Sequence, residues 1–273
     1  HPEAFPPYYM GILESAELTG RLDETLESLA DYLERELDTR SKVVSALSYP
    51  GVVMVMALFT VAVLAGYVLP QFKPLFEEMN ADLPLATRSL LFFADVFTIY
   101  WYIPLTGFIC MFAGVLWLTK TEKGKRVKDK LVLKIPVVGG IIDYAILERF
   151  CRILSTMIRA GVPLPVGLRT TTEATSNTIY RERLEIAQAE MLEGGGFSKP
   201  LVETGLFPGA AKQMFKVGEE TGTLDEQLAV ASTYFDRELE SRIKKFTTMF
   251  EPIMIVGVGV MVGFVAVALV SAM

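Results

Sequence analysis

Apolar residues along this chain gather into three long runs, and charged residues recur in the segments between them. The runs cover residues 51–69, 97–118 and 253–273, and none of them contains a charged side chain. Each reaches the roughly 17–25 residues that a helix needs to cross the hydrocarbon layer of a membrane. A buried helix of a soluble domain would be shorter and interrupted by polar positions. The pattern therefore predicts transmembrane helices at residues 50–69, 97–118 and 252–273.

The segment between the second and third runs has the pattern of short amphipathic helices. Residues 143–160 place apolar side chains at helical spacing, and Gly161 follows as a helix cap. A second helix is predicted over residues 180–192, where Gly194-Gly195-Gly196 ends it. Alternation typical of strands is absent from the sequence. We therefore predict an all-α fold in which residues 119–251 form a six-helix-type antiparallel bundle.

The chain contains the same module twice. Residues 5–50 align with residues 207–252 without a gap, and sixteen of the 46 aligned positions are identical. The identical pairs are Phe5/Phe207, Pro6/Pro208, Glu17/Glu219, Thr19/Thr221, Gly20/Gly222, Leu22/Leu224, Asp23/Asp225, Glu24/Glu226, Leu26/Leu228, Tyr32/Tyr234, Arg35/Arg237, Glu36/Glu238, Leu37/Leu239, Arg40/Arg242, Lys42/Lys244 and Pro50/Pro252. A repeat this long indicates a duplicated domain. Residues 1–49 are expected to be the C-terminal part of the first domain, whose N-terminal half is missing.

A helix corner is the most similar part of the two copies. It reads AELTGRLDETL at residues 16–26 and GEETGTLDEQL at residues 218–228. Gly20 and Gly222 can adopt the left-handed conformation that ends one helix, so we expect them to be hinges. Farther along each copy, Pro50 and Pro252 are expected to redirect the helix as it enters the membrane.

Seven acidic residues surround these corners and have two interpretations. Asp23, Glu24, Asp225 and Glu226 are expected in the first turn of a helix, where the helix dipole favours negative charge. Glu17, Glu219 and Glu220 precede the glycines, where the dipole does not favour them. Helix capping alone would explain the first group. Glu17 and Glu219 would be either contacts to a partner protein or buried polar links.

Lysine and arginine near the runs predict the orientation in the membrane. Seven lysine or arginine residues lie in the first part of the segment at 119–251, whereas residues 70–96 hold only Lys73 and Arg88. Basic residues favour the cytoplasmic side. The N-terminus and residues 119–251 are therefore expected in the cytoplasm. The loop at 70–96 and the C-terminus are expected outside.

The sequence offers little for catalysis or for cofactor binding. It has no G-x-x-x-x-G-K-[ST] phosphate loop, and its one histidine is His1. Cys110 and Cys151 are too few for a cysteine-rich zinc site and are expected on different sides of the membrane boundary. The net charge is −6, without the basic stripe typical of nucleic-acid binding. We expect no enzymatic activity, no cofactor and no nucleic-acid partner; an adventitious divalent cation at the acid pairs stays open.

The apolar runs themselves look like anchors. They contain no ionisable residue of the kind that marks a transport path through a membrane. Gly257, Gly259 and Gly263 in the third run include a G-x-x-x-G pattern that favours close packing of helices in a membrane. A small transporter and a membrane-bound processing enzyme are the alternatives. The transporter would need polar groups inside the runs, and the enzyme would need paired acids at the membrane face; the sequence places neither there.

The motifs resemble those of the type II secretion system F family, which includes inner-membrane platform proteins of type II secretion and of type IV pili. The resemblance rests on the F-P…G-E-x-T-G-x-L-x-x-x-L…Y corner in two copies and on the segments at 69–91 and 134–168. Ala16 replaces the first glycine of the motif in the first copy. The order of domain, two spans, domain and one span is also that of the family.

The resemblance implies a platform protein without chemistry of its own, in the bacterial inner membrane. Such proteins assemble as homo-oligomers and contact a hexameric assembly ATPase, other inner-membrane assembly proteins and membrane lipid. They couple the ATPase to the insertion or extraction of pilin or pseudopilin subunits. The family serves secretion, pilus and DNA-uptake machines. In this chain the seven corner acids would be the cytoplasmic contacts.

Overall fold

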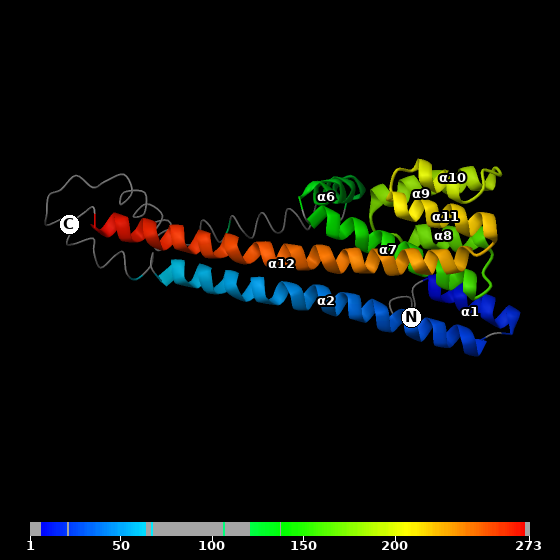
Figure 1. Ribbon diagram of the computed structural model, residues 1–273, viewed down its shortest axis with the longest axis horizontal. Helices are drawn as coiled ribbons and strands as arrows, with labels where there is room; N and C mark the ends of the chain where they lie inside the picture. The colour runs from blue at the N-terminus through cyan, green and yellow to red at the C-terminus, as the bar shows by residue number, and fades with distance from the viewer. Residues whose placement is uncertain are drawn as a thin grey trace. The chain divides into compact units, whose positions relative to one another are not determined.

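The computed structural model of the chain describes residues 7–20, 22–63, 67, 106, 121–136 and 138–270. Over these residues the chain is helical and contains no strand, which confirms the all-α prediction for this part (Figure 1). The helices are α1 (Pro7–Thr19), α2 (Leu22–Val63), α6 (Glu122–Lys134), α7 (Val138–Arg159), α8 (Leu164–Ala174), α9 (Thr178–Leu192), α10 (Ser198–Glu203), α11 (Gly209–Thr221) and α12 (Leu224–Val270).

The chain forms two compact units. One contains residues 1–43 and 121–243, and the other contains residues 44–120 and 244–273. The first unit holds α1, α6 to α11 and the first parts of α2 and α12. The division between the units falls within α2 and α12, a few residues before Pro50 and Pro252.

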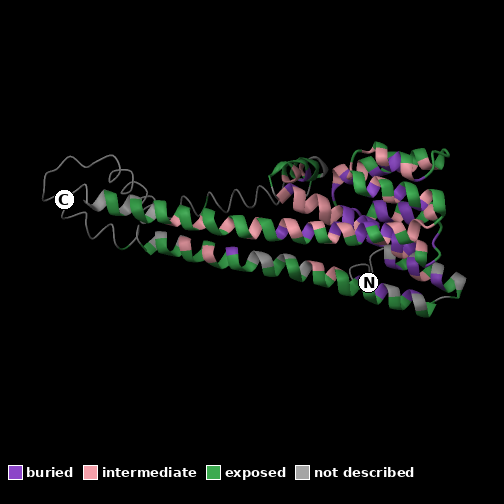
Figure 2. Cartoon of the chain, viewed as in Figure 1, coloured by how far each residue is buried: buried purple, intermediate pink, exposed green. Residues whose placement is uncertain are grey.

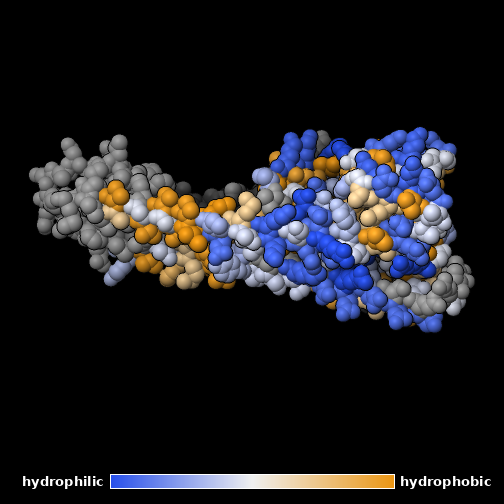
Figure 3. All heavy atoms as spheres, in the orientation of Figure 1, coloured by the Kyte–Doolittle hydropathy of each residue, from blue (hydrophilic) through white to orange (hydrophobic). Residues whose placement is uncertain are grey.

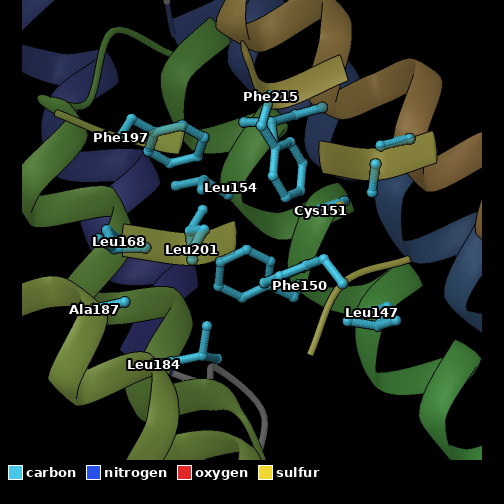
Figure 4. Packing of buried hydrophobic residues seen from close by; sticks show 14 of the residues in the cluster. Leu147, Phe150, Cys151, Leu154, Leu168, Leu184, Ala187, Phe197, Leu201 and Phe215 are labelled. Carbon is cyan, nitrogen blue, oxygen red and sulfur yellow. The ribbon is translucent and has the colours of Figure 1, made fainter. Parts of the chain in front are cut away.

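Helix α7 lies at the centre of the first unit and is buried on two faces. One face contributes Phe150, Cys151 and Leu154 to a core that α8 to α12 complete (Figure 4). The other face contributes Ile153 and Met157 to a second cluster. Buried positions are concentrated on these helices in Figure 2. Because the positions recur at three- and four-residue spacing on each face, one helix can join two clusters.

The second cluster is where the first copy of the repeat packs. Tyr9 and Ile12 of α1 and Leu29 and Tyr32 of α2 meet the outer face of α7 there, and the Tyr9 and Tyr32 rings pack edge to face, with centroids 6.2 Å apart. The two copies therefore contact different faces of the same helix. This arrangement brings equivalent positions of the repeat close to α7.

The turns of the bundle occur where the local sequence favours them. Gly161 follows α7 with a φ of 82°, Gly194 and Gly196 follow α9 with φ values of 93° and 72°, and Pro165 lies in the first turn of α8. Positive φ costs a glycine little because it has no Cβ atom. The side chain of Asn177 caps α9 by accepting the N–H groups of Ile179 and Tyr180.

Helix α6 was not expected from the sequence, because seven basic residues at 120–134 obscured its apolar face. Asp129 of this helix accepts two hydrogen bonds from Thr178, from the backbone N–H at 2.8 Å and from the hydroxyl at 2.9 Å. Arg126 pairs with Glu182 of α9 at 2.8 Å. These contacts fix α6 to the N-terminal half of α9.

The two copies of the repeat form the same helices but bury different positions. Helices α1 and α11 occupy aligned residues and have 13 residues each, and α2 and α12 begin at the aligned Leu22 and Leu224. However, Leu26 is 48% exposed whereas its counterpart Leu228 is 0% exposed. Exposure differs in the same way at Leu37 and Leu239. The apolar stripe that α12 buries against the bundle is thus uncovered on α2, within the described residues.

The second unit contains the remaining parts of α2 and α12, which carry mostly apolar side chains. Val55 and Phe59 of α2 and Ile255 and Val260 of α12 are exposed. Figure 3 shows hydrophobic residues gathered along this part of the chain. Among the residues that the structure describes, no helix is both long and apolar enough to span a membrane.

Most of the predicted spans and loops fall on residues that are not described. Of residues 70–96 nothing is described, and of the predicted span at 97–118 only Thr106 is. The predicted span at 50–69 is described to Val63 and at Tyr67, and the one at 252–273 to Val270. The number of spans and their orientation therefore stay predictions.

Candidate functional site

The corner between α11 and α12 is built on a left-handed glycine. Gly222 has a φ of 73° and a ψ of 16°, and its N–H donates to the carbonyl of Gly218. The N–H of Thr223 donates to the same carbonyl at 2.9 Å. These bonds satisfy an acceptor at the end of α11 that has no partner within the helix. Helix α12 then begins at Leu224, with Asp225 and Glu226 in its first turn.

The corner between α1 and α2 repeats this conformation. Gly20 has a φ of 69°, and its N–H lies 3.4 Å from the carbonyl oxygen of Glu17. A Cβ atom at Gly20 or Gly222 would meet nothing within 4 Å. The need for glycine at both corners is therefore conformational and does not come from close packing.

Replacing Gly222 with alanine is expected to destabilise the first unit by about 1 kcal/mol, because an L residue in the left-handed region crowds its own carbonyl. Gly209, which also has open space around its Cβ position but lies in α11 without a positive φ, is the matched control. Gly209→Ala should be neutral or slightly stabilising. Thermal unfolding followed by circular dichroism would compare the two variants; equal melting temperatures would contradict the conformational role.

Glu219 makes the most extensive polar contacts at the second corner. One carboxylate oxygen accepts the backbone N–H of Phe197 at 2.5 Å, and the other accepts the N–H of Ser198 at 2.9 Å together with the Ser198 hydroxyl. These are the first N–H groups of α10, which the helix itself cannot satisfy. Glu219 therefore caps α10 from the end of α11. Of the two alternatives for this residue, the structure places it in a polar link within the chain.

The environment of Glu219 favours its charged form. Burial raises the pKa of the carboxyl group, but the hydrogen bonds from Ser198 and from the backbone of Phe197 outweigh it, so the pKa is lowered from 4.5. Gly196 allows this close approach: a Cβ atom on it would lie 2.6 Å from Glu219 Oε1. The glycine turn and the carboxylate thus form one local arrangement.

The other acids of the second corner differ in the contacts that they make within the chain. Asp225 lies 3.7 Å from Arg159 Nε, and its backbone carbonyl accepts the Ser155 hydroxyl at 2.8 Å. Glu220 is exposed and lies 3.9 Å from Lys216 on the same helix. Glu226 is also exposed. Asp225 is therefore tied to α7, whereas Glu220 and Glu226 present their carboxylates to solvent.

At the first corner, Glu17 and Asp23 are exposed as well, and the side chain of Glu24 is not among those described. The two corners thus share exposed acids close to a left-handed glycine. A surface charge of this kind costs little stability to change. This makes the exposed acids suitable for mutation without loss of the fold.

A groove that the sequence did not predict opens beside the second corner. It has a volume of about 440 Å³ and is lined by apolar side chains that include Leu164, Leu168 and Met191, with Gly222 and Leu224 at the corner itself. Its lining comes from α7, α8, α9, α11 and α12, so no single segment of the sequence could reveal it. Glu219 and Asp225 also line it, so the groove has an apolar floor with two acids at the corner.

The remaining predicted positions lie along the long helices. Helix α2 continues through Pro50 and α12 continues through Pro252. Gly257, Gly259 and Gly263 are exposed, and a Cβ atom on any of them would meet nothing within 4 Å in the described part of the chain. Their role in packing between helices stays a prediction.

Groups of ligands suited to a metal ion do not occur among the described residues. Cys151 is a free cysteine, and burial raises the pKa of its thiol well above 9.0. Such a thiol is present almost entirely in its unreactive protonated form. Cys151 is therefore a small core side chain.

Comparison with known proteins identifies the family. The sequence profile described as "Type II secretion system (T2SS), protein F" matches residues 1–70 and 150–272. These two segments contain the two copies of the repeat.

Individual relatives match over nearly the whole chain. The type IV pilus assembly protein TapC of Aeromonas hydrophila is 32% identical over 98% of this chain, and the chain spans 65% of the length of TapC. The type IV pilus assembly protein PilC of Pseudomonas aeruginosa is 31% identical over 98% of the chain and is covered over 72% of its own length. The type II secretion system protein F of Aeromonas hydrophila is 32% identical over 99% of the chain, with 70% of its own length covered. The chain belongs to the type II secretion system protein F family.

Proposed function

We propose that this chain is a non-enzymatic platform protein of a type II secretion or type IV pilus machine in the bacterial inner membrane. It couples a cytoplasmic hexameric ATPase to the insertion or extraction of pilin or pseudopilin subunits. The observation that carries the proposal is the similarity to members named for both machines over 98–99% of the chain. Whether the chain works in a secretion system or in a pilus depends on the partner proteins that it binds.

The helical unit supports a role in transmitting force. Its helices pack around α7 through two apolar clusters, so a contact at one surface is passed on to the whole unit. The sequence has no phosphate loop that could bind and hydrolyse ATP by itself. The energy must therefore come from a partner, and the apolar spans provide the anchor and the contact to pilin helices.

The exposed corner acids are the proposed contacts to the ATPase. Glu220 and Glu226 are exposed at the second corner, next in sequence to Glu219 and Asp225, which line the apolar groove, and Glu17 and Asp23 are exposed at the first. A surface with an apolar centre and a charged border is typical of a specific protein interface. Glu219 acts differently, because its oxygens are occupied by α10 and it maintains the shape of the corner.

The test is binding of the purified full-length chain in detergent to the assembly ATPase of the same organism. Reversal of two exposed acids in Glu220→Lys plus Glu226→Lys should weaken binding at least tenfold, because unlike charges at an interface favour association. Glu185→Lys plus Glu190→Lys on α9 makes the same change of charge at other exposed positions and serves as the control.

Three outcomes of this binding experiment decide whether the corner acids contact the ATPase. Loss of binding in the corner variant alone supports docking at the corner. Equal loss in both variants shows a dependence on overall charge and contradicts a specific contact. If the unchanged chain does not bind the ATPase, the coupling role is wrong, and the chain acts through its other partners.

A further inference from the structure

A cleft in the first unit is lined by residues of α2, α7, α11 and α12. It has a volume of about 710 Å³, within the range of pockets that bind small molecules. Four arginines line it: Arg35 from α2, Arg152 and Arg159 from α7, and Arg237 from α12. We call it the arginine cleft. Of the residues that line it, the proposed platform function uses only Glu226.

The duplication supplies equivalent side chains to this one cleft. Tyr32 and Arg35 of the first copy align with Tyr234 and Arg237 of the second, and all four residues line the cleft. In each copy the tyrosine and arginine are three residues apart, so they share one face of their helix. Two equivalent pairs of ring and guanidinium group thus face a common space.

Arg152 adds a buried donor without a partner. Its side chain is only 9% exposed, and its Nε lies 3.2 Å from Oε1 of Glu148. The terminal Nη1 is buried and has no hydrogen-bond partner, and the guanidinium carbon lies 4.8 Å from the centre of the Tyr32 ring. A buried N–H group that lacks an acceptor is costly. An oxygen of a bound ligand would satisfy it.

Carboxylates at the cleft leave several arginine donors available. Glu148 and Asp225 approach Arg152 and Arg159 through Nε, and Nη1 of Arg152 has no hydrogen-bond partner. Asp31 and Glu226 also line the cleft. The cleft therefore offers planar donor groups together with two carboxylate acceptors and the ring of Tyr234.

We propose that the arginine cleft binds a nucleotide whose base carries an amino group. Guanidinium groups are the preferred partners of phosphate, because their paired N–H groups match two phosphate oxygens. The partly exposed ring of Tyr234 provides a flat surface for the base, and Asp31 or Glu226 accepts hydrogen bonds from its amino group. Binding would join both copies of the repeat to α7 and so make the unit sensitive to a small molecule.

Calorimetric titration of the full-length chain in detergent tests this proposal. The probes are ATP, GTP, pyrophosphate and inorganic phosphate, each at the same salt concentration. Arg35→Gln and Arg237→Gln should each weaken nucleotide binding about tenfold, because each removes a charged hydrogen bond. Arg169→Gln changes an arginine of α8 that is 67% exposed and lies outside the cleft, and it should leave binding unchanged.

Arg152→Lys separates binding from folding. Lysine retains the charge that Glu148 requires but lacks the planar fork, so nucleotide binding should be lost while the melting temperature stays close to that of the unchanged chain. The proposal is wrong if neither nucleotide binds or if Arg169→Gln weakens binding as much as the cleft variants. Inorganic phosphate that binds as tightly as ATP would indicate an adventitious ion only. Binding confined to vesicles of phosphatidylglycerol would assign a lipid headgroup and overturn the nucleotide.

Discussion

Replacing Arg152 with methionine is expected to destabilise the first unit by about 3–5 kcal/mol, the cost of leaving one partner of a buried ion pair alone. The side chains of Arg152 and Glu148 are only 9% and 5% exposed. Glu148 would keep the hydrogen bond that it accepts from the Ser232 hydroxyl at 3.2 Å but would lose its ion pair. Thermal unfolding followed by circular dichroism should show a melting temperature lower by roughly 10 °C, at about 2–4 °C per kcal/mol for a unit of this size.

The controls use a second pair with the same spacing in sequence. Arg169 and Glu173 are also four residues apart, but their side chains are 67% and 60% exposed. Arg169→Met should therefore cost less than about 0.5 kcal/mol, because water screens an exposed pair. The double variant Glu148→Leu plus Arg152→Met should recover most of the loss, since no buried charge stays behind. A double variant less stable than Arg152→Met would contradict this explanation.

The acidity of Glu148 adds a dependence on pH. Burial raises the pKa of its carboxyl group above 4.5, and the charge of Arg152 opposes this effect. Without Arg152 the pKa in the folded chain should therefore be higher still. A carboxyl group whose pKa is raised on folding favours the folded state below 4.5, and this contribution is lost as the pH rises through the folded pKa. The deficit of Arg152→Met should shrink as the pH falls toward 4.5.

Local features of the fold could be predicted from the sequence because short-range chemistry determines them. The helix predicted over residues 180–192 occurs as α9, and the turn at Gly194-Gly195-Gly196 follows it where it was expected. Glycine and proline restrict or permit backbone angles whatever surrounds them. The corner at Gly222 follows the same rule. Such positions need no knowledge of the tertiary structure.

Contacts between distant segments could not be predicted in this way. Glu219 and Ser198 are 21 residues apart, and only the packing of α10 against α11 brings them together. The aligned Leu26 and Leu228 have the same sequence context but opposite exposure, because different helices surround them. The arginine cleft likewise depends on side chains from four helices. A repeat in sequence therefore predicted the same helices in both copies but not the same surroundings.

Replacing Glu219 with alanine is expected to destabilise the first unit by about 2–4 kcal/mol, because it leaves the N–H groups of Phe197 and Ser198 without their acceptors. Glu219→Gln should lose less, since its amide oxygen can still accept one of these bonds. Glu220→Ala is the matched control: the neighbouring acid is exposed and pairs weakly with Lys216 at 3.9 Å, so less than about 0.5 kcal/mol should be lost.

The dependence on pH distinguishes this cap from an ordinary surface acid. The pKa of Glu219 is lowered from 4.5 in the folded chain, so its contribution is fully present above pH 4.5 and is lost as the pH falls through the folded pKa. Melting temperatures measured between pH 7 and pH 3 should therefore converge for Glu219→Ala and the unchanged chain at the acid end. A constant difference across this range, or an equal loss in Glu220→Ala, would show that the carboxylate does not hold α10. Convergence would make Glu219 the residue that sets the shape of the corner, and its exposed neighbours the ones left to meet a partner.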